Sequence, residues 1–241
     1  KARPRNLSDS ALLDLVQRVG SRPILLPTSD ETALFVAENA RTLAREFRLA
    51  TPAAEVVRTF ASKKRMSDLC NQLGIPTPQT ALPQSGDEVS RFAKATEFPV
   101  IVKGEDGEFL RHQKQRVRVA IVPTIRELLE IYELNAAAEG NAGIIVQEYI
   151  PGDDDTIWMF NGYFNDRFEC LFGATGRKLR QFPIHRGSTS LGICLRNDTV
   201  EAQTLRLMQA VRYCGPLDLG YRYDARDGQY KLLDVNPTIG A

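Results

Sequence analysis

GYRYDARDGQYKLLDVNPTIGA, residues 220–241, is the stretch that says most about the fold of this chain. Two runs rich in Tyr, Leu and Val flank Asp227-Gly228, a pair typical of a β-hairpin turn. The second run ends in Asp234-Val-Asn236-Pro237. Residues two apart on a strand point to the same face, so Asp234 and Asn236 present two oxygen ligands side by side. Such a pair suits a hard cation such as Mg²⁺, although an edge strand with surface residues before a turn would show the same pattern.

The composition is that of an ordinary globular protein. The 241 residues, 25% charged and 43% hydrophobic, suffice for a substantial core. A net charge of +1 argues against a dedicated nucleic-acid-binding protein, and the lack of a long apolar run argues against a membrane span. The scattered cysteines predict reduced thiols rather than a zinc site or disulfides, in keeping with a cytoplasmic location. Because the chain begins with Lys1 and stops soon after the hairpin, both ends are expected to be trimmed.

Hydrophobic periodicity and capping signals predict a mixture of helices and strands. Residues 22–27 form a buried-strand candidate, followed by a helix capped by Thr28 and Glu31. Further strands are expected at 98–103, 143–149, 156–164 and 167–172, and further helices at 64–73, 124–139 and, starting with Asp198 and Glu201 as its cap, 198–213. The predicted strands are separated by irregular lengths of sequence, and only some of these intervals contain a helix. This arrangement indicates α+β lobes rather than a single parallel sheet.

Three segments carry candidate ligand-binding cations. Lys63 begins a helix, where a lysine is also common on a solvated surface. Lys103 ends the apolar run 99–102, and a lysine that emerges from a buried strand needs an anionic partner unless it leaves the sheet edge for water. Lys178 and Arg180 are expected on one strand face, where paired cations suit a transferring phosphoryl group or an acyl phosphate.

Taken in order, these motifs resemble those of the ATP-grasp superfamily over about residues 60–241. The resemblance implies an ATP-grasp fold, in which two α+β lobes clasp ATP, after a partial Rossmann-like α/β pre-ATP-grasp lobe at residues 1–60. It implies an N-terminal lobe at 61–150 and a truncated C-terminal lobe at 151–241. The segment 215–237 is most similar to carbamoyl-phosphate-synthase-like, carboxylate–amine ligase branches.

The resemblance also implies a role for each candidate residue. Lys63 and Lys103 would bind the ATP phosphates, and Asp155 would bind the ribose. The interlobe hinge that binds adenine would comprise Gln147, Glu148, Tyr149 and Ile150, with the backbone at Glu148 and Ile150 providing the hydrogen bonds. Mg²⁺ or Mn²⁺ would be held by Asp234 and Asn236, and Asp218 or Asp224 would provide a further acidic ligand, with Asp218 the better placed opposite Asp234. Lys178 and Arg180 would be catalytic.

The activity implied by the resemblance is that of an ATP-dependent ligase. Such an enzyme activates a carboxylate as an acyl phosphate, which an amine or similar nucleophile then attacks. Its expected partners are small-molecule carboxylate and amine substrates, and a homodimer is one expected assembly. Nucleic acid and membrane are not expected partners.

The sequence departs from the family pattern at three places, and the first two favour a second hypothesis. The first acidic metal ligand falls by spacing on Gly220 or Tyr221, and Thr238 stands where an arginine is common. The loop expected to cover the phosphates, residues 104–108, has only two glycines. The second hypothesis is therefore a catalytically reduced nucleotide-binding domain with a regulatory or assembly role.

Overall fold

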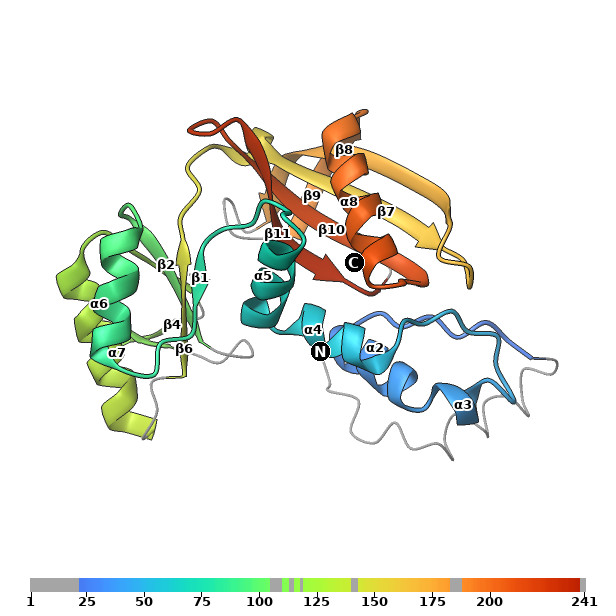
Figure 1. Ribbon diagram of the computed structural model, residues 1–241, viewed down its shortest axis with the longest axis horizontal. Coiled ribbons are helices and arrows are strands. Elements are labelled where there is room, and N and C mark those ends of the chain that lie inside the picture. Colours follow the sequence, from blue (N-terminus) through green and yellow to red (C-terminus); the bar gives the residue numbers. More distant parts are fainter. Residues whose placement is uncertain are drawn as a thin grey trace.

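The computed structural model describes residues 22–104, 110–112, 115–117, 119–139, 143–182 and 188–238. Its two larger sheets are antiparallel and lie on either side of helix α5 (Lys63–Gln72), as Figure 1 shows. Helices are interspersed with these sheets along the chain, so the predicted α+β class is confirmed.

The first sheet has the strand order β1-β6-β2-β5, with β1 at Thr80–Ala81, β6 at Ile144–Glu148, β2 at Val100–Gly104 and β5 at Val119–Val122. Helices α6 (Gly86–Ala95) and α7 (Ile125–Glu139) pack together beside this sheet (Figure 1). Apolar side chains of the helices and strands, such as Val89, Leu128 and Val146, form one core between them. A separate ribbon pairs β3 (Leu110–His112) with β4 (Gln115–Val117).

The second sheet has the strand order β11-β10-β7-β8-β9. Its strands are β7 (Ile157–Phe164), β8 (Cys170–Phe182), β9 (Ser188–Cys194), β10 (Gly215–Asp224) and β11 (Gln229–Asn236). Helix α8 (Asp198–Ala210) contacts β7 and β8, and the short 3₁₀ helix η2 (Asp154–Thr156) precedes β7. The predicted terminal hairpin is confirmed as β10 and β11, and Gly228 in its turn has a φ of +71°.

Local sequence accounts well for helix α5. The Ser62 hydroxyl accepts a hydrogen bond from the Arg65 N–H, which caps the first turn. The helix ends before Gly74, whose φ of +62° favours glycine, and the Ile75 N–H closes the turn on the Cys70 carbonyl at 2.8 Å. Pro76 then prevents the helix from continuing. The predicted helix at 64–73 is therefore confirmed within one residue at each end.

The hydrophobic core assigns α5 to the second sheet. Phe60, Met66 and Cys70 are fully buried in one cluster with side chains of β7, β10, β11 and α8. One hydrophobic core thus joins the segment around α5 to the second sheet, whereas the first sheet has a separate core. The domain boundaries at residues 61 and 151 remain predictions.

The described part of residues 1–60 does not confirm a Rossmann-like lobe. It contains α2 (Asp30–Glu38), α3 (Ala40–Leu43) and α4 (Ala54–Ala61). Residues 22–27 form only an isolated parallel bridge, Ile24 to Arg48, and Ile24 is 68% exposed, so the expectation of a buried strand was wrong.

Two of the predicted helix caps were wrong by one position. Helix α2 is capped by Ser29 and Thr32, which exchange hydrogen bonds, rather than by Thr28 and Glu31. Helix α8 is capped by Asn197 rather than Asp198. Asn and Ser both accept a hydrogen bond from the first turn, so neighbouring polar residues compete for the position. None of the helices in the described ranges is long and apolar enough to cross a membrane.

The packing of α8 leads to a stability prediction. We expect Leu207→Ala to lower the free energy of unfolding by about 2–5 kcal/mol, because Leu207 is fully buried and its loss leaves a cavity. The matched change Leu134→Ala, at an exposed position of α7, should cost less than about 0.5 kcal/mol. Urea denaturation followed by circular dichroism measures both, and equal losses would contradict the assignment of Leu207 to the core.

Candidate active site

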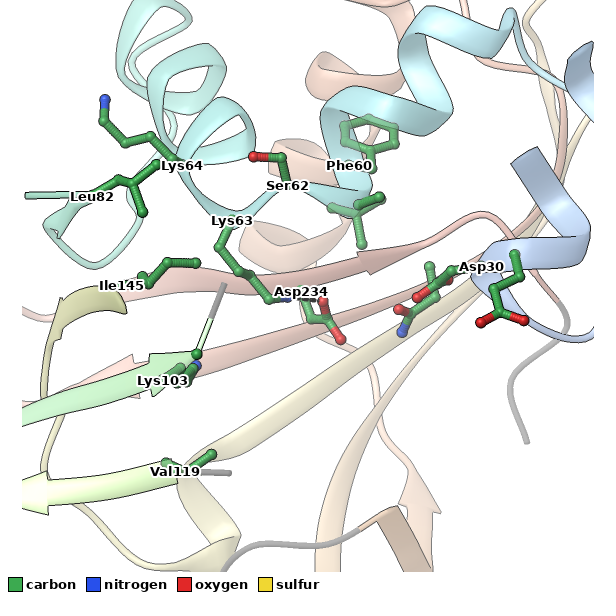
Figure 2. A pocket seen from close by; sticks show the side chains of 15 residues that line it. Asp30, Phe60, Ser62, Lys63, Lys64, Leu82, Lys103, Val119, Ile145 and Asp234 are labelled. Carbon is green, nitrogen blue, oxygen red and sulfur yellow. Dashed lines mark hydrogen bonds and ion pairs between the residues drawn. The ribbon is translucent and has the colours of Figure 1, made fainter. Parts of the chain in front are cut away.

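A cavity of about 520 Å³ lies between the two sheets, beside the start of α5 (Figure 2). Four parts of the chain contribute to its wall: the start of α2, the α4–α5 junction, the first sheet and the end of β11. The charged and polar lining residues are Asp30, Glu31, Ser62, Lys63, Lys64, Lys103, Asp234 and Asn236. The predicted Lys63, Lys103, Asp234 and Asn236 are therefore brought together, although up to 173 positions separate them in the sequence.

Lys63 reaches from the first turn of α5 toward β11 (Figure 2). Its Nζ forms an ion pair with Asp234 and donates a longer hydrogen bond, 3.4 Å, to the Leu233 carbonyl. Burial alone would raise the pKa of Asp234, but the charge and hydrogen bond of Lys63, with smaller contributions from the Asn236 amide and the charge of Lys103, together outweigh burial and lower it. Asp234 is therefore held in its ionised form, the form that a metal ion or a cationic group requires.

Lys103, near the end of β2, has a neutral partner. Its Nζ donates to the Gln147 Oε1 atom at 3.0 Å, and the Gln147 amide in turn donates to the Thr80 hydroxyl at 3.0 Å. Burial lowers the pKa of Lys103 to about 8, with a further contribution from the positive charge of Lys63. No ion pair of Lys103 occurs within the described residues, so the anionic partner that the sequence predicts is not supplied by this part of the protein.

The hairpin register places the candidate metal ligands on adjacent strands. Asp218 on β10 lies opposite Asn236 on β11, and Gly220 lies opposite Asp234. The Asn236 side-chain amide donates to the Asp218 carboxylate at 3.4 Å. Asp218 was expected opposite Asp234; that expectation was wrong by two positions, because the register depends on the turn and not on the sequence separation alone.

Of the two positions at which the resemblance predicts an acidic ligand, Gly220 lies opposite Asp234. Tyr221, the alternative position, is fully buried and shares a hydrogen bond of 2.8 Å with Thr204, so it faces the core. A β carbon on Gly220 would come no nearer to a described atom than 3.9 Å, the distance to the β carbon of Asp234. No group of three or more His, Cys, Asp and Glu residues in the described segments is arranged to hold a metal ion. Asp218, Asp234 and Asn236 thus provide two carboxylates and one amide.

Lys178 is electrostatically linked to these acids, whereas Arg180 is exposed on β8. Burial lowers the pKa of Lys178, and the carboxylates of Asp218, Asp234 and Asp154 oppose that shift. Burial also raises the pKa of Asp218, and Asp234 adds to that increase. A break in the β8–β9 register lies between Lys178 and Arg180, so the regular alternation behind their predicted common face does not hold there. Neither residue lines the cavity.

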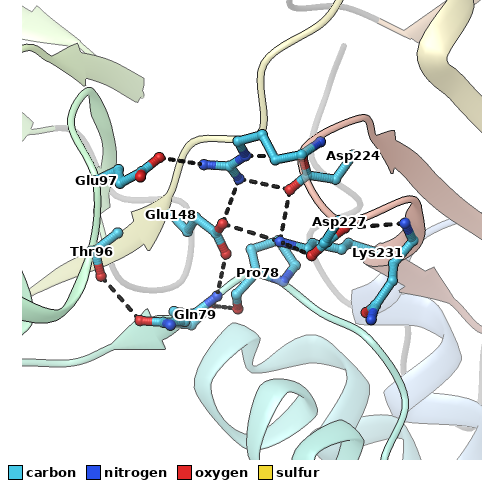
Figure 3. Close-up of polar contacts among 11 residues, drawn as sticks. Pro78, Gln79, Thr96, Glu97, Glu148, Asp224, Asp227 and Lys231 are labelled. Carbon is cyan, nitrogen blue, oxygen red and sulfur yellow. Dashed lines mark hydrogen bonds and ion pairs between the residues drawn. The ribbon is translucent and has the colours of Figure 1, made fainter.

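The residues predicted to bind adenosine do not line the cavity. Gln147 is buried and its side chain is used by Lys103 and Thr80. The Glu148 carboxylate is engaged by cations of the terminal hairpin (Figure 3). Tyr149 and Ile150 follow the end of β6, and Asp155 lies exposed in η2. An adenine site at this hinge therefore remains a prediction, and so does the ribose contact of Asp155.

The structure adds cavity residues that the sequence did not single out. Asp30 and Glu31 lie at the start of α2 and line the cavity together with Ile145 and Val119 of the first sheet. No local signal could have found them, because an acidic first turn is common at any helix start. Most of the glycine-poor loop at 104–108 lies outside the described residues, although Gly104 lines the cavity.

Comparison with solved structures identifies the fold of this chain. The chain superimposes on a biotin carboxylase from Campylobacter jejuni, solved as a β,γ-ATP complex, with a TM-score of 0.71 and 16% identity over 100% of this chain and 55% of that one. It also matches N5-carboxyaminoimidazole ribonucleotide synthetase from Thermus thermophilus, with a TM-score of 0.65 and 21% identity over 97% and 58% of the chains. These structures share their fold with this chain, so the ATP-grasp fold predicted from the sequence is confirmed, apart from the Rossmann-like lobe expected at residues 1–60.

Among curated proteins, the chain is similar to particular ligases. It is 23% identical to D-aspartate ligase of Enterococcus faecium over 228 residues, which are 90% of this chain and 53% of that protein. It is 24% identical to D-alanine–D-alanine ligase of Stutzerimonas stutzeri over 183 residues, which are 74% and 55% of the two chains. The chain thus spans about half the length of these relatives. No protein-family model matches it.

The lowered pKa of Lys103 gives a pH-dependent prediction. A phosphate partner favours the charged amine, so ATP affinity should be highest below pH 8 and should fall as the pH rises through about 8. Lys103→Ala should weaken ATP binding about tenfold at pH 7 and should flatten this pH dependence. Isothermal titration calorimetry measures both, with Lys94→Ala, at an exposed position of α6, as the control. Unchanged affinity in folded Lys103→Ala would rule out Lys103 as a phosphate ligand.

Proposed function

We propose that this chain carries the nucleotide-binding and phosphoryl-transfer part of an ATP-dependent ligase, one that activates a small-molecule carboxylate and couples it to an amine. The observation that carries the proposal is the convergence of two lysines and two metal-ligand candidates in one cavity between two sheets. The similarity to D-aspartate ligase and D-alanine–D-alanine ligase supports it.

In the proposed site, Lys63 and Lys103 bind the phosphates of ATP. Both amines lie beside the cavity, and Lys103 lacks an ion-pair partner among the described residues. An incoming triphosphate supplies the negative charge that this pair requires, and it competes with Asp234 for Lys63. The backbone at Glu148 and Ile150 binds the adenine, and Asp155 binds the ribose.

The donor set at the end of the hairpin fits Mg²⁺ or Mn²⁺. Carboxylate and amide oxygens are the ligands that such hard cations prefer. Asp218 on β10 lies opposite Asn236 on β11, and Asp234 is two residues before Asn236 on the same strand. Burial and the charge of Asp234 raise the pKa of Asp218, so a cation placed between these carboxylates relieves an unfavourable arrangement. When bound, the ion neutralises charge on the phosphates of ATP. Three protein ligands leave room for phosphate oxygens and water.

The proposed reaction has two steps. A carboxylate oxygen of the first substrate attacks the γ-phosphorus, the bond to the β,γ-bridging oxygen breaks and ADP leaves. The amine nitrogen of the second substrate then attacks the acyl carbon, phosphate leaves and the nitrogen loses a proton. Lys178 lies near the candidate metal ligands and stabilises negative charge on the transferring group, together with Arg180. A homodimer and a cytoplasmic location belong to the same proposal.

Asp234→Asn tests the proposed role of the hairpin. The change keeps the size of the side chain but removes the charge that a hard cation needs, so carboxylate-dependent ADP release should fall at least about a hundredfold. Coupled-enzyme detection of ADP, with a panel of carboxylates and amines, measures this activity. Mg-ATP at about 100 times its Kd should stabilise the wild type by about 2.7 kcal/mol in thermal melts and should stabilise the variant much less. Equal ADP release by both proteins would refute the assignment.

A specific observation supports the second hypothesis, a nucleotide-binding domain with reduced activity. Gly220 lies directly opposite Asp234, where no side chain can contribute a ligand. Thr238, at the position where the family commonly has arginine, is buried. A domain of this kind would bind Mg-ATP but would turn it over slowly, because fewer oxygen ligands hold the ion.

Restoring an acid at position 220 distinguishes the two hypotheses. The site has room for a β carbon, so Gly220→Glu should bind Mg-ATP more tightly and, if the missing ligand limits catalysis, should release ADP at least about tenfold faster than the wild type. Gly220→Ala, which adds the β carbon without the charge, is the matched control. Rapid ADP release by the wild type with no gain in Gly220→Glu favours the fully active ligase.

A further inference from the structure

Away from the cavity, five charged residues form a cluster that joins the end of β6 to the terminal hairpin (Figure 3). They are Glu148, Asp224, Arg226, Asp227 and Lys231. We propose that the terminal hairpin positions the nucleobase-binding hinge through this cluster, with Arg226 and Lys231 as positioning residues that act through Glu148. The inference rests on the proposed function, because it concerns the hinge at which that function places adenine.

The first observation is that the Glu148 carboxylate is fully engaged. One oxygen accepts from Arg226 at 2.5 Å and from Lys231 at 3.1 Å. The other oxygen accepts from the Gln79 N–H at 3.1 Å, while the Glu148 N–H donates to the Gln79 carbonyl at 2.8 Å. The Glu148 side chain is therefore committed to the hairpin and to the segment 76–79 that precedes β1, which leaves the backbone that follows Glu148 to contact a base.

The second observation is the burial of the cluster. The Asp224 side chain is 0% exposed, that of Lys231 is 10% exposed and that of Glu148 is 12% exposed. The Lys231 amine lies 2.7 Å from Asp224 and 3.2 Å from Asp227, so it joins three carboxylates. Arg226 lowers the pKa of Asp224 well below its ordinary value. Ion pairs this well buried hold a fixed geometry far better than exposed ones do.

The third observation is that the hairpin also holds the segment just after the hinge. Arg222 on β10 donates to the Gly152 carbonyl and, at 3.1 Å, to the Thr156 hydroxyl. On the other edge of the hairpin, the Leu232 N–H donates to the Pro76 carbonyl at 2.8 Å, and the Thr77 hydroxyl donates to the Leu232 carbonyl at 3.0 Å. The hairpin therefore fixes the segment 148–152 at both ends and also holds the segment 76–79 that precedes β1.

The consequence is a link between the two ends of a bound nucleotide. Lys231, which holds the hinge, lies on the same strand as Asp234 and Asn236, three and five residues away. One rigid strand thus sets the distance between the adenine end and the metal end of the site. Loosening the cluster should weaken the contacts to the base while it leaves Lys63 and Lys103 free to bind phosphates.

The test separates the base from the phosphates. Calorimetry in Mg²⁺ should compare ATP with inorganic tripolyphosphate on the wild type, Lys231→Met and Arg226→Gln. Both variants should bind ATP at least about tenfold more weakly and should bind tripolyphosphate within about twofold of the wild type. Lys231→Arg, which keeps a cation, should recover most of the ATP affinity. The control is Glu97→Gln: Glu97 contacts Arg226 at 3.4 Å, but its side chain is 83% exposed, so this variant should change neither affinity.

Each other outcome overturns the proposal. Parallel losses for ATP and tripolyphosphate indicate a purely structural role, and unchanged ATP binding shows that the cluster does not position the hinge. Thermal melts identify a variant that has failed to fold, and Arg226→Gln, at the more exposed cation, is the milder change. If the wild type binds tripolyphosphate as tightly as it binds ATP, the hinge is not an adenine site. If the wild type binds neither ligand, the proposed function itself is wrong.

Discussion

The register of the β10–β11 hairpin is the constraint on which both polar regions depend. Pairing of Asp218 with Asn236 brings the candidate metal ligands to one end, and pairing of Asp224 with Gln229 sets the turn at the other. A shift of one residue would move every side chain to the opposite face. Asp234 would then point away from Lys63, and Lys231 away from Glu148. The many backbone hydrogen bonds of the hairpin therefore protect the geometry of the few side chains that carry charge.

Charge compensation explains why the cavity remains polar between the two sheets. Lys63 neutralises Asp234, whereas the hydrogen-bond partner of Lys103 among the described residues is the neutral Gln147 amide, and burial lowers the pKa of Lys103. Burial likewise raises the pKa of Asp218 and lowers that of Lys178, and both shifts favour the neutral form of the side chain. Buried groups shifted in this way are common at functional sites, because a ligand of opposite charge repays the cost of desolvation. The charged cluster around Glu148 differs, since its cations and carboxylates satisfy one another.

Local sequence patterns identified most of the secondary structure. The Asp227-Gly228 turn, the apolar run before Lys103 and the Gly74-Ile75-Pro76 stop each reflect a backbone preference that does not depend on distant residues. The failures have equally physical causes. Ile24 belongs to an apolar run but gains only one bridge and stays exposed, and the cap of α8 moved to Asn197 because adjacent polar residues compete for one N–H.

By itself, the sequence predicted the α+β class and singled out Lys63, Lys103, Asp234 and Asn236 as candidate site residues, because residue type and strand alternation are local properties. Only the tertiary structure decided which charges meet. It paired Lys63 with Asp234 across 171 positions, placed Gly220 rather than Tyr221 opposite that acid, and committed Glu148 to the hairpin. Contacts of this kind depend on the register of distant strands and on the packing of α5 against the second sheet. Neither is encoded in any short stretch of the chain.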